Sequence, residues 1–322
     1  MKGRRIAVAL WIGVAGALAS ACGGAPAPGA AGADAASAAR HAALRGELQA
    51  ALDSLRLRGG FPGATAAVAL PDGAVVEVAS GVADRATGEP LRPGDRMLAG
   101  SVGKTFFAAL ALDLVREGRL DLDAPVSRYL GDLPWFGRLP NAADVTVRML
   151  MRHTSGLVRY EFDPRVAALL AAEPDKVWTP AERVSYILDT AAPFAAGEGW
   201  EYSDTNYIVL GMILQRLAGD DLHDAIRRRY LAPLGLAGTI PSDRRELPGV
   251  VQGHAGPQNP FGGFETMIGA DGRFVINPQM EWAGGGYAST AGDLARWARL
   301  LYGGRVHDDA TLTAMLETVP AP

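Results

Sequence analysis

The sequence predicts an α+β protein with one large domain, and three observations carry this prediction. An apolar hairpin pattern comes early in the chain, a strongly apolar helix follows it, and the later periodic segments are helical. Hydrophobic residues make up 48% of the 322 residues, which is ample for a large core. We find no internal repeat and no second linker after about residue 41, so we expect a single unit from there on.

The first 21 residues have the three-part pattern of a secretory signal. A positive start, MKGRR, precedes an apolar run over 6–18 that is too short to span a bilayer comfortably, and small residues follow. We therefore expect residues 1–21 to be a signal peptide and the protein to be exported to the cell envelope or periplasm. Cys22, the only cysteine, resembles the modified residue of a bacterial lipoprotein box, which predicts a lipid anchor. Plain cleavage after A-S-A is the alternative.

Residues 22–40 are small, interrupted by Pro and Gly, and almost uncharged. Such a segment buries too little surface to fold, so we expect a tether. The domain proper is expected over 41–322. Leucines at helical spacing predict its first helix over 42–57, and Gly59-Gly60 ends it.

A β-hairpin is predicted next. Residues 64–70 are continuously apolar, Pro71-Asp72-Gly73 forms a turn, and residues 74–82 alternate roughly between apolar and other side chains. A strongly apolar helix is then predicted over 101–117, ended by Gly118. Further helices are predicted over 146–152, 180–190, 206–217, 222–230, 290–301 and 310–316.

Composition and missing motifs exclude several function classes. A net charge of −4 argues against a nucleic-acid partner. One cysteine excludes a disulfide framework and a Cys-rich metal site, and the five histidines form no HExxH pattern, so no metal or organic cofactor is expected. The chain has no G-x-S-x-G elbow, no Walker loop and no G-x-G-x-x-G opening a helix.

Ser101 and Lys104 form an S-x-x-K pattern at the start of the apolar helix. On a helix, side chains three residues apart share a face, and the free N–H groups of the first turn suit a nucleophile whose attack creates an oxyanion. The chain has three lysines against 28 arginines, and only lysine can lose its proton and act as a base. A helix-capping Ser beside a solvated Lys is the structural alternative.

Tyr202-Ser203-Asp204 precedes a second helix. A tyrosine beside a Ser–Lys pair acts as a base if a cation stabilises its phenolate. Alone, the segment would indicate a core tyrosine followed by an Asp that caps a helix.

The order of these motifs, with other segments, resembles the penicillin-recognising serine hydrolases, in particular the branch of class C β-lactamases, D-Ala-D-Ala carboxypeptidases and related esterases. The resemblance runs from about Pro62 to Met315. Besides the two motifs it rests on the segments GVAD at 81–84 with Thr87-Gly88, GRLDLDAPV at 118–126, HTSGL at 153–157, YSDTNY at 202–207, PLGL at 233–236, and AGGG at 283–286 with Ser289-Thr290.

The resemblance implies a β-lactamase/transpeptidase-like fold, in which helices flank an antiparallel sheet and a helical subdomain is added. It implies that Ser101 is the acylated nucleophile, that Lys104 and Tyr202 share proton transfer, and that the Ser101 N–H forms half of an oxyanion hole. His153 and Ser155 are expected to belong to a structural turn. The glycines at 284–286 are expected to form a tight backbone crossing near the site.

Asp204 departs from the family pattern, which often has Asn there. Asn donates a hydrogen bond to a substrate carbonyl, whereas ionised Asp only accepts. We expect Asp204 to pair with Lys104, to keep it protonated and to shift the base role towards Tyr202.

A second departure concerns the third family box, K-T-G or H-[ST]-G, which is not found between Tyr287 and Pro322. We therefore expect the domain to be incomplete at its C-terminus. The missing part would include strands of the sheet and one oxyanion donor, and the hairpin would lack further strand partners.

The sequence thus predicts a serine hydrolase that works through an acyl-enzyme. Its substrate is a small or peptidoglycan-derived molecule, namely a β-lactam, a D-amino-acid peptide or an ester. The alternative is a non-catalytic or truncated envelope protein that binds peptidoglycan-like ligands. The sequence does not indicate an oligomeric state.

Overall fold

The computed structural model describes residues 28–256 and 264–320. The chain divides into two units, residues 1–43 and residues 44–322. Helix α1, Pro28–Gly59, begins in the first unit and ends in the second. No helix of the described ranges is both long and apolar enough to cross a membrane.

Helix α1 starts earlier than predicted and includes residues 28–40, which the sequence analysis assigned to the tether. Alanine has the highest helix propensity, and it fills seven of these thirteen positions. Pro28 stands at the first helical position, where its missing N–H costs nothing. Residues 1–27, with the predicted signal peptide and Cys22, lie outside the described residues.

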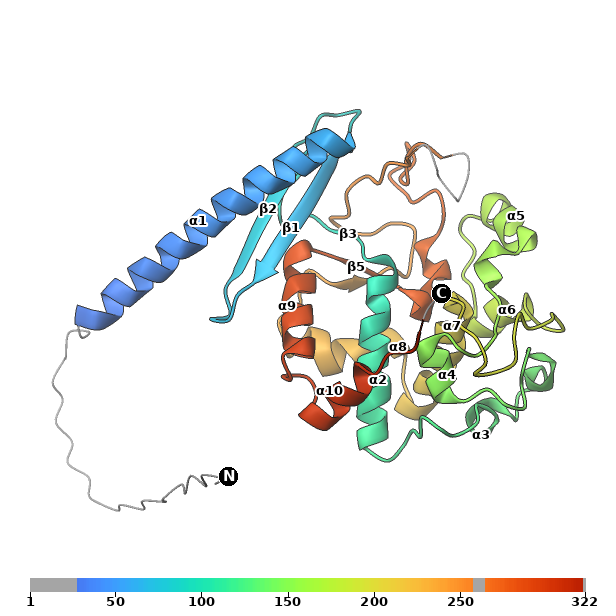
Figure 1. Ribbon diagram of the computed structural model, residues 1–322. Helices are drawn as coiled ribbons and strands as arrows, with labels where there is room; N and C mark the ends of the chain where they lie inside the picture. Colours follow the sequence, from blue (N-terminus) through green and yellow to red (C-terminus); the bar gives the residue numbers. More distant parts are fainter. Residues whose placement is uncertain (1–27, 257–263, 321–322) are drawn as a thin grey trace, which may run out of the picture. The chain divides into compact units, whose positions relative to one another are not determined.

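The predicted hairpin is present. Strand β1, Gly63–Ala69, pairs antiparallel with β2, Val75–Gly81, with Ala66 opposite Val78. Among the described residues the two strands pair only with each other. Helix α9, Ala291–Tyr302, packs on the hairpin, as Figure 1 shows. The end of α1 also contacts it, because Arg56 Nε donates to Ser80 Oγ at 2.8 Å.

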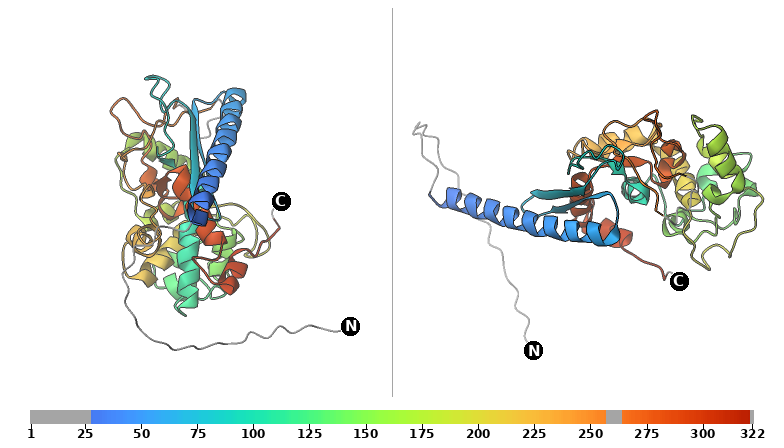
Figure 2. Two further views of the ribbon diagram at one scale, coloured as in Figure 1. Left: turned by 90° about the vertical axis from the view of Figure 1, so that its left-hand side faces the viewer. Right: turned by 90° about the horizontal axis from the view of Figure 1, so that it is seen from above.

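Two central helices form most of the core. Helix α2, Lys104–Arg116, and helix α7, Asp204–Ala218, contact each other, and both are buried almost all round. Apolar side chains on nearly every face are typical of helices that other elements enclose. Helices α3 to α6 lie at the end of the second unit away from the hairpin (Figures 1 and 2). The remaining helices are α3 Ser127–Leu130, α4 Val147–Arg152, α5 Pro164–Ala172, α6 Pro180–Ser185, α8 Leu222–Ile226 and α10 Asp309–Met315.

A second small sheet lies beside α2. Its strands β3, Met97–Leu98, and β4, Ile240–Pro241, both pair antiparallel with β5, Tyr287–Ser289. Strand β5 is fully buried and follows the predicted glycine segment directly. The sheet therefore connects that segment to the residues just before Ser101. The fold is the predicted α+β, β-lactamase/transpeptidase-like one, with antiparallel sheets and a separate helical region.

Three predicted helices differ in detail. The helix predicted over 222–230 is α-helical only as far as Ile226, and Arg227–Leu231 follows as a π-helical turn. The helix predicted over 101–117 begins with a 3₁₀ turn, Gly100–Gly103, and is α-helical only from Lys104. The helix predicted over 180–190 ends at Ser185, and Asp189 adopts a left-handed backbone with φ 60°. There its carboxylate binds Arg138 at 3.0 Å, which favours the turn.

Candidate active site

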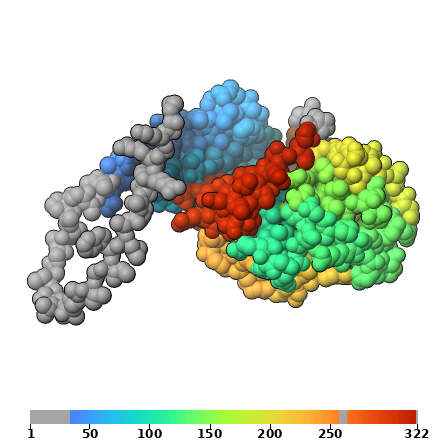
Figure 3. Space-filling view, turned by 60° about the horizontal axis from the view of Figure 1, so that its bottom comes forward, coloured from blue at the N-terminus to red at the C-terminus, as the bar shows by residue number. Residues whose placement is uncertain are grey.

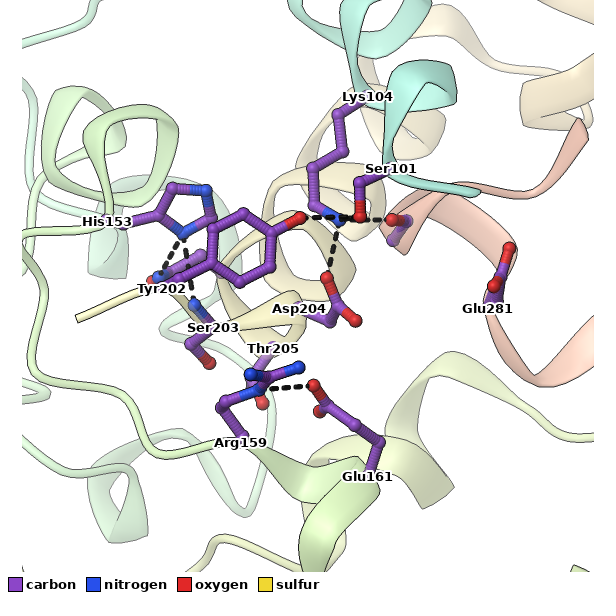
Figure 4. A network of polar contacts seen from close by, with 12 residues as sticks. Ser101, Lys104, His153, Arg159, Glu161, Tyr202, Ser203, Asp204, Thr205 and Glu281 are labelled. Carbon is purple, nitrogen blue, oxygen red and sulfur yellow. Dashed lines mark hydrogen bonds and ion pairs between the residues drawn. The ribbon is translucent and has the colours of Figure 1, made fainter. Parts of the chain in front are cut away.

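Side chains from three segments meet at the hydroxyl of Ser101 (Figure 4). Ser101 lies in the exposed 3₁₀ turn, Lys104 is the first residue of α2, and Tyr202 lies on the loop before α7. Tyr202 Oη donates to Ser101 Oγ at 2.6 Å, and Lys104 Nζ donates to the same oxygen at 3.1 Å. The three residues predicted to be catalytic are therefore in direct contact.

A close backbone crossing holds Ser101 in place. Gly100 has φ 52°, and Gly103 packs so tightly against Gly285 that a Cβ at position 103 would overlap the Gly285 carbonyl oxygen. A Cβ on Gly285 would in turn meet the Gly100 carbonyl oxygen at 2.7 Å. The predicted tight crossing at residues 284–286 is confirmed. Gly285 contacts the chain on both sides of Ser101, at Gly100 and at Gly103.

Lys104 is buried, with 6% of its surface exposed, and its ammonium group has three acceptors. It donates to Ser101 Oγ, to Asp204 Oδ1 at 2.5 Å, and to the carbonyl of Gly284. The rings of Tyr202 and Tyr207 lie 5.0 and 5.5 Å from Nζ, within the range of cation–π attraction. The structure thus brings Asp204 and Lys104 together as an ion pair.

His153 supports the tyrosine. It caps α4 with a left-handed φ of 59°, and its ring lies 4.4 Å from that of Tyr202. Its Nδ1 accepts a hydrogen bond from Ser203 N at 3.3 Å. Burial, followed by the charge of Lys104, lowers the pKa of His153 to about 4, so the ring is neutral at pH 7. A neutral ring that packs against Tyr202 at an interplanar angle of 33° fits the predicted structural role.

Ser155 belongs to the same turn. Its hydroxyl donates to Asn206 Oδ1 at 2.5 Å and accepts from Leu157 N at 3.0 Å. The side chain is fully buried, so it joins the turn to α7 and faces no substrate. This arrangement agrees with the structural role predicted for Ser155.

Three charged residues beside the site were not predicted from the sequence. Arg159 Nε donates to Glu161 Oε1 at 2.7 Å, and the Arg159 guanidinium lies 5.5 Å from the Tyr202 ring (Figure 4). Burial, then the nearby charge of Asp204, raises the pKa of Glu161 to about 7. Burial also raises the pKa of Glu281, whose carboxylate accepts from Gly286 N at 3.3 Å. The only signal for these residues in the sequence is that they lie close to recognised segments. Arg159 and Glu161 follow HTSGL closely, and Glu281 precedes the glycines.

No group of three or more His, Cys, Asp or Glu side chains within the described ranges is arranged to hold a metal ion. Cys22, the predicted lipidation site, lies outside those ranges.

Comparison with known proteins agrees with this geometry. The chain is 31% identical to penicillin-binding protein 4 of Amycolatopsis lactamdurans, over 82% of this chain and 65% of the relative. It is 32% identical to esterase EstB of Burkholderia gladioli, over 61% of this chain and 51% of the relative. It therefore spans less than two thirds of the length of these curated relatives.

A solved structure is similar in fold as well as in sequence. The D-amino acid amidase from Ochrobactrum anthropi SV3, in complex with D-phenylalanine, superposes with a TM-score of 0.69 at 29% identity. The match covers 82% of this chain and 73% of the amidase chain. The family model described as Beta-lactamase matches residues 40–320, so the resemblance inferred from the motifs is confirmed and the chain belongs to the Beta-lactamase family.

Proposed function

We propose that the protein is a serine hydrolase that cleaves amides or esters through an acyl-enzyme, with D-amino-acid amides as the preferred class. The observation that carries the proposal is the position of Ser101 Oγ, which lies within hydrogen-bond reach of both Lys104 Nζ and Tyr202 Oη. A nucleophile in contact with two groups able to exchange protons is the arrangement that acyl transfer needs.

The proposed reaction has two stages. Ser101 Oγ attacks the substrate carbonyl, and its proton passes to the Lys104–Tyr202 pair. That proton then goes to the departing amine or alcohol, leaving the acyl group on Ser101. Water attacks the ester in the second stage and gives a proton to the same pair, which passes it to Ser101 Oγ as the C–O bond breaks. The carboxylic acid is released and the serine hydroxyl is restored. The Ser101 N–H is proposed as one oxyanion donor.

Asp204 is proposed to fix the charge of Lys104. A carboxylate 2.5 Å from Nζ favours the ammonium form, which leaves Tyr202 as the group that accepts the serine proton. The Tyr202 ring is well placed for this role, because the ammonium lies 5.0 Å from its centre and stabilises negative charge on the phenol.

Charge around the site favours substrates with a positive group. Two cations, Lys104 and Arg159, face three carboxyls, Asp204, Glu161 and Glu281. Burial is the first cause that raises the pKa of Glu161, to about 7, and of Glu281, and the charge of Asp204 adds to it in both. A further positive charge beside them would favour the ionised form of each carboxyl. A substrate ammonium would supply that charge, whereas the carboxylate of a penicillin would add to the repulsion. The larger number of carboxyl groups than of cations at the site therefore favours an amino-acid amide over a β-lactam as the substrate.

The test compares three substrates on the same enzyme. We expect kcat/KM to be highest for D-phenylalanine amide, lower for its N-acetyl form, which lacks the ammonium, and lowest for acylation by a fluorescent penicillin. Ser101→Ala should abolish all three reactions. Lack of turnover together with lack of labelling by a fluorophosphonate would overturn the hydrolase. Normal labelling with faster turnover of the N-acetyl substrate would overturn only the substrate preference.

The non-catalytic alternative is not favoured, because relatives over most of the chain carry the names of hydrolases such as D-amino acid amidase.

We also propose export with a lipid anchor on Cys22, which rests on the sequence pattern of residues 1–22. Metabolic labelling with palmitate should modify the wild-type protein but not Cys22→Ala. Absence of label in both would support plain cleavage instead.

A further inference from the structure

A cavity of about 400 Å³ lies against α2, and Lys104 and Thr105 at the start of that helix are among its lining residues. Its walls come from α2, from α4, and from residues 314–319 at the end of the described chain. The C-terminal segment, red in Figure 3, lies across the surface of the green and teal elements there. The volume is within the range of small-molecule sites.

Most of the cavity wall is apolar. Its apolar lining includes Ala108 and Leu112 of α2, Leu122, Met151 of α4 and Met315 of α10. Trp200 and Tyr207 add aromatic surface. An apolar body of matching size would gain roughly 25 cal/mol for each Å² that it buries there.

One end of the cavity is positively charged. Arg148 and Arg152 are one turn apart on α4, so both side chains lie on the same face of the helix. Asp123 already neutralises Arg148 with two hydrogen bonds, at 2.7 and 2.8 Å. Arg152 instead forms its ion pair with Glu317, whose carboxylate also lies 3.8 Å from Arg148.

Glu317 is an exposed partner for this cation. Its side chain is 61% exposed, compared with 23% for Arg152, and it lies beyond the end of α10 on no regular element. An ion pair this exposed contributes little free energy, because water screens the charges and ordering a long side chain costs entropy. An external carboxylate can therefore replace Glu317 at small cost.

We propose that this cavity is a binding site for carboxylates with an apolar body, such as medium-chain fatty acids, and that Glu317 occupies the head-group position in the empty protein. The ligand's carboxylate binds Arg152 and Arg148, and its chain lies along α2 between Ala108 and Leu112. Ser101 and Tyr202 do not line the cavity, but Lys104 does, so the proposed site adjoins the catalytic lysine.

Decanoate is the probe, with decanol as the matched ligand without charge. Binding to the full chain is measured by calorimetry after Ser101 has been blocked with a fluorophosphonate, or in Ser101→Ala, so that the reaction site does not contribute. We expect decanoate to bind about tenfold more tightly than decanol, since a charge-assisted hydrogen bond is worth about that factor. Arg152→Gln should lower the affinity for decanoate about tenfold and leave that for decanol unchanged.

Two further variants keep the test decisive if Arg152→Gln folds poorly. Glu317→Gln removes the internal competitor at an exposed position and should raise the affinity for decanoate several-fold. Arg138→Gln is the control, because it loses a surface ion pair with Asp189 that does not line the cavity, and it should bind as the wild type does. Equal affinities for decanoate and decanol, no change in Glu317→Gln, or no binding at all would each overturn the proposal.

Discussion

At the scale of single residues, the ammonium of Lys104 has a fully defined hydrogen-bond environment. Its three donors have three acceptors, namely Ser101 Oγ, Asp204 Oδ1 and the Gly284 carbonyl. The compact ammonium fits this buried site, whereas a planar guanidinium is larger and presents its five donors in a fixed fork. The exchange of Lys for Arg, conservative in charge, is therefore a sharp test of the site.

Lys104→Arg should lower the rate of Ser101 acylation by about 10²–10⁴, the usual contribution of positioned proton transfer. The rate is measured as labelling by a fluorophosphonate, with circular dichroism to confirm folding. Lys176→Arg is the matched control, because Lys176 forms an ion pair with Glu182 at 2.9 Å away from the nucleophile. A Lys104→Arg variant that labels at the wild-type rate would contradict the assignment.

Asp204→Asn should raise the rate of acylation by a fluorescent penicillin. The amide removes one negative charge beside Lys104 and adds a donor for a substrate carbonyl. The rate of labelling is compared with that of the wild type at equal concentrations of penicillin. An unchanged or lower rate would argue against an inhibitory role for the Asp204 charge.

Glu161 should make binding of a cationic substrate depend on pH. Its pKa is raised to about 7, so the carboxyl is protonated below pH 7 and charged above it. The α-amine of D-phenylalanine amide loses its own proton at about pH 7.7, so the test uses the range from about pH 6 to about pH 7.5. Over that range KM for D-phenylalanine amide should fall as the pH rises, and the dependence should disappear in Glu161→Gln. The N-acetyl substrate serves as the control. The same pH profile in both enzymes would assign the titration to another group.

The sequence predicted the four residues at the site because each belongs to a short motif with chemical meaning. S-x-x-K gives Ser101 and Lys104, and Y-S-D gives Tyr202 and Asp204. Glu161 and Glu281 escaped prediction because isolated acidic residues are common on surfaces. Only the fold buries these two beside the Lys104–Asp204 pair.

At the scale of elements, the 3₁₀ turn at 100–103 and the glycine segment at 284–286 position the nucleophile together. They approach at Gly103 and Gly285, where any Cβ on Gly103 would overlap backbone. Backbone cannot move aside as a flexible side chain does, so the crossing requires glycine. The same segment leads directly into β5 and provides the Gly284 carbonyl for Lys104.

Gly103→Ala should push the two segments apart and lower both stability and activity. We expect a loss of about 1–3 kcal/mol in the free energy of unfolding, as for other overpacked sites, together with slower labelling of Ser101. Urea denaturation and fluorophosphonate labelling measure the two effects. Gly46→Ala is the control: it lies exposed on α1 with free space around it and should stabilise the helix by about 0.5–1 kcal/mol. Wild-type stability in Gly103→Ala would show that the crossing can relax.

The sequence was most informative for long elements with a clear period. Helices α2, α7 and α9 and the hairpin were predicted within a few residues, because each shows a sustained apolar pattern. Strands β3, β4 and β5 have only two or three residues, too few for any period to appear, and they exist because distant segments pair. The start of α1 was missed because its small residues were interpreted as a tether.

At the scale of the whole second unit, one buried carboxylate joins three distant parts of the chain. Asp113 of α2 accepts from Tyr230 Oη at 2.7 Å and binds Arg229 Nε at 2.8 Å, both in the turn after α8. His307, just before α10, lies 3.4 Å from the same carboxylate. The cluster therefore connects the helix that carries Lys104 to the segment that closes the proposed carboxylate site.

Asp113→Asn should destabilise the protein at neutral pH and much less in acid. Burial alone would raise the pKa of Asp113, but the nearby His307, the hydrogen bond from Tyr230 and the charge of Arg229 outweigh it, so the pKa is lowered. A carboxyl with a lowered pKa stabilises the fold at pH values above its ordinary pKa near 4, and this stabilisation is lost as the pH falls through the folded-state pKa.

We expect the Asp113→Asn variant to lose about 1–3 kcal/mol in the free energy of unfolding at pH 7, measured by urea denaturation, and to differ less from the wild type at pH 3. Asp189→Asn, which breaks an exposed ion pair, should change stability by less than about 1 kcal/mol at both pH values. If Asp113→Asn is equally destabilised at pH 7 and pH 3, the charge of Asp113 is not what joins these elements.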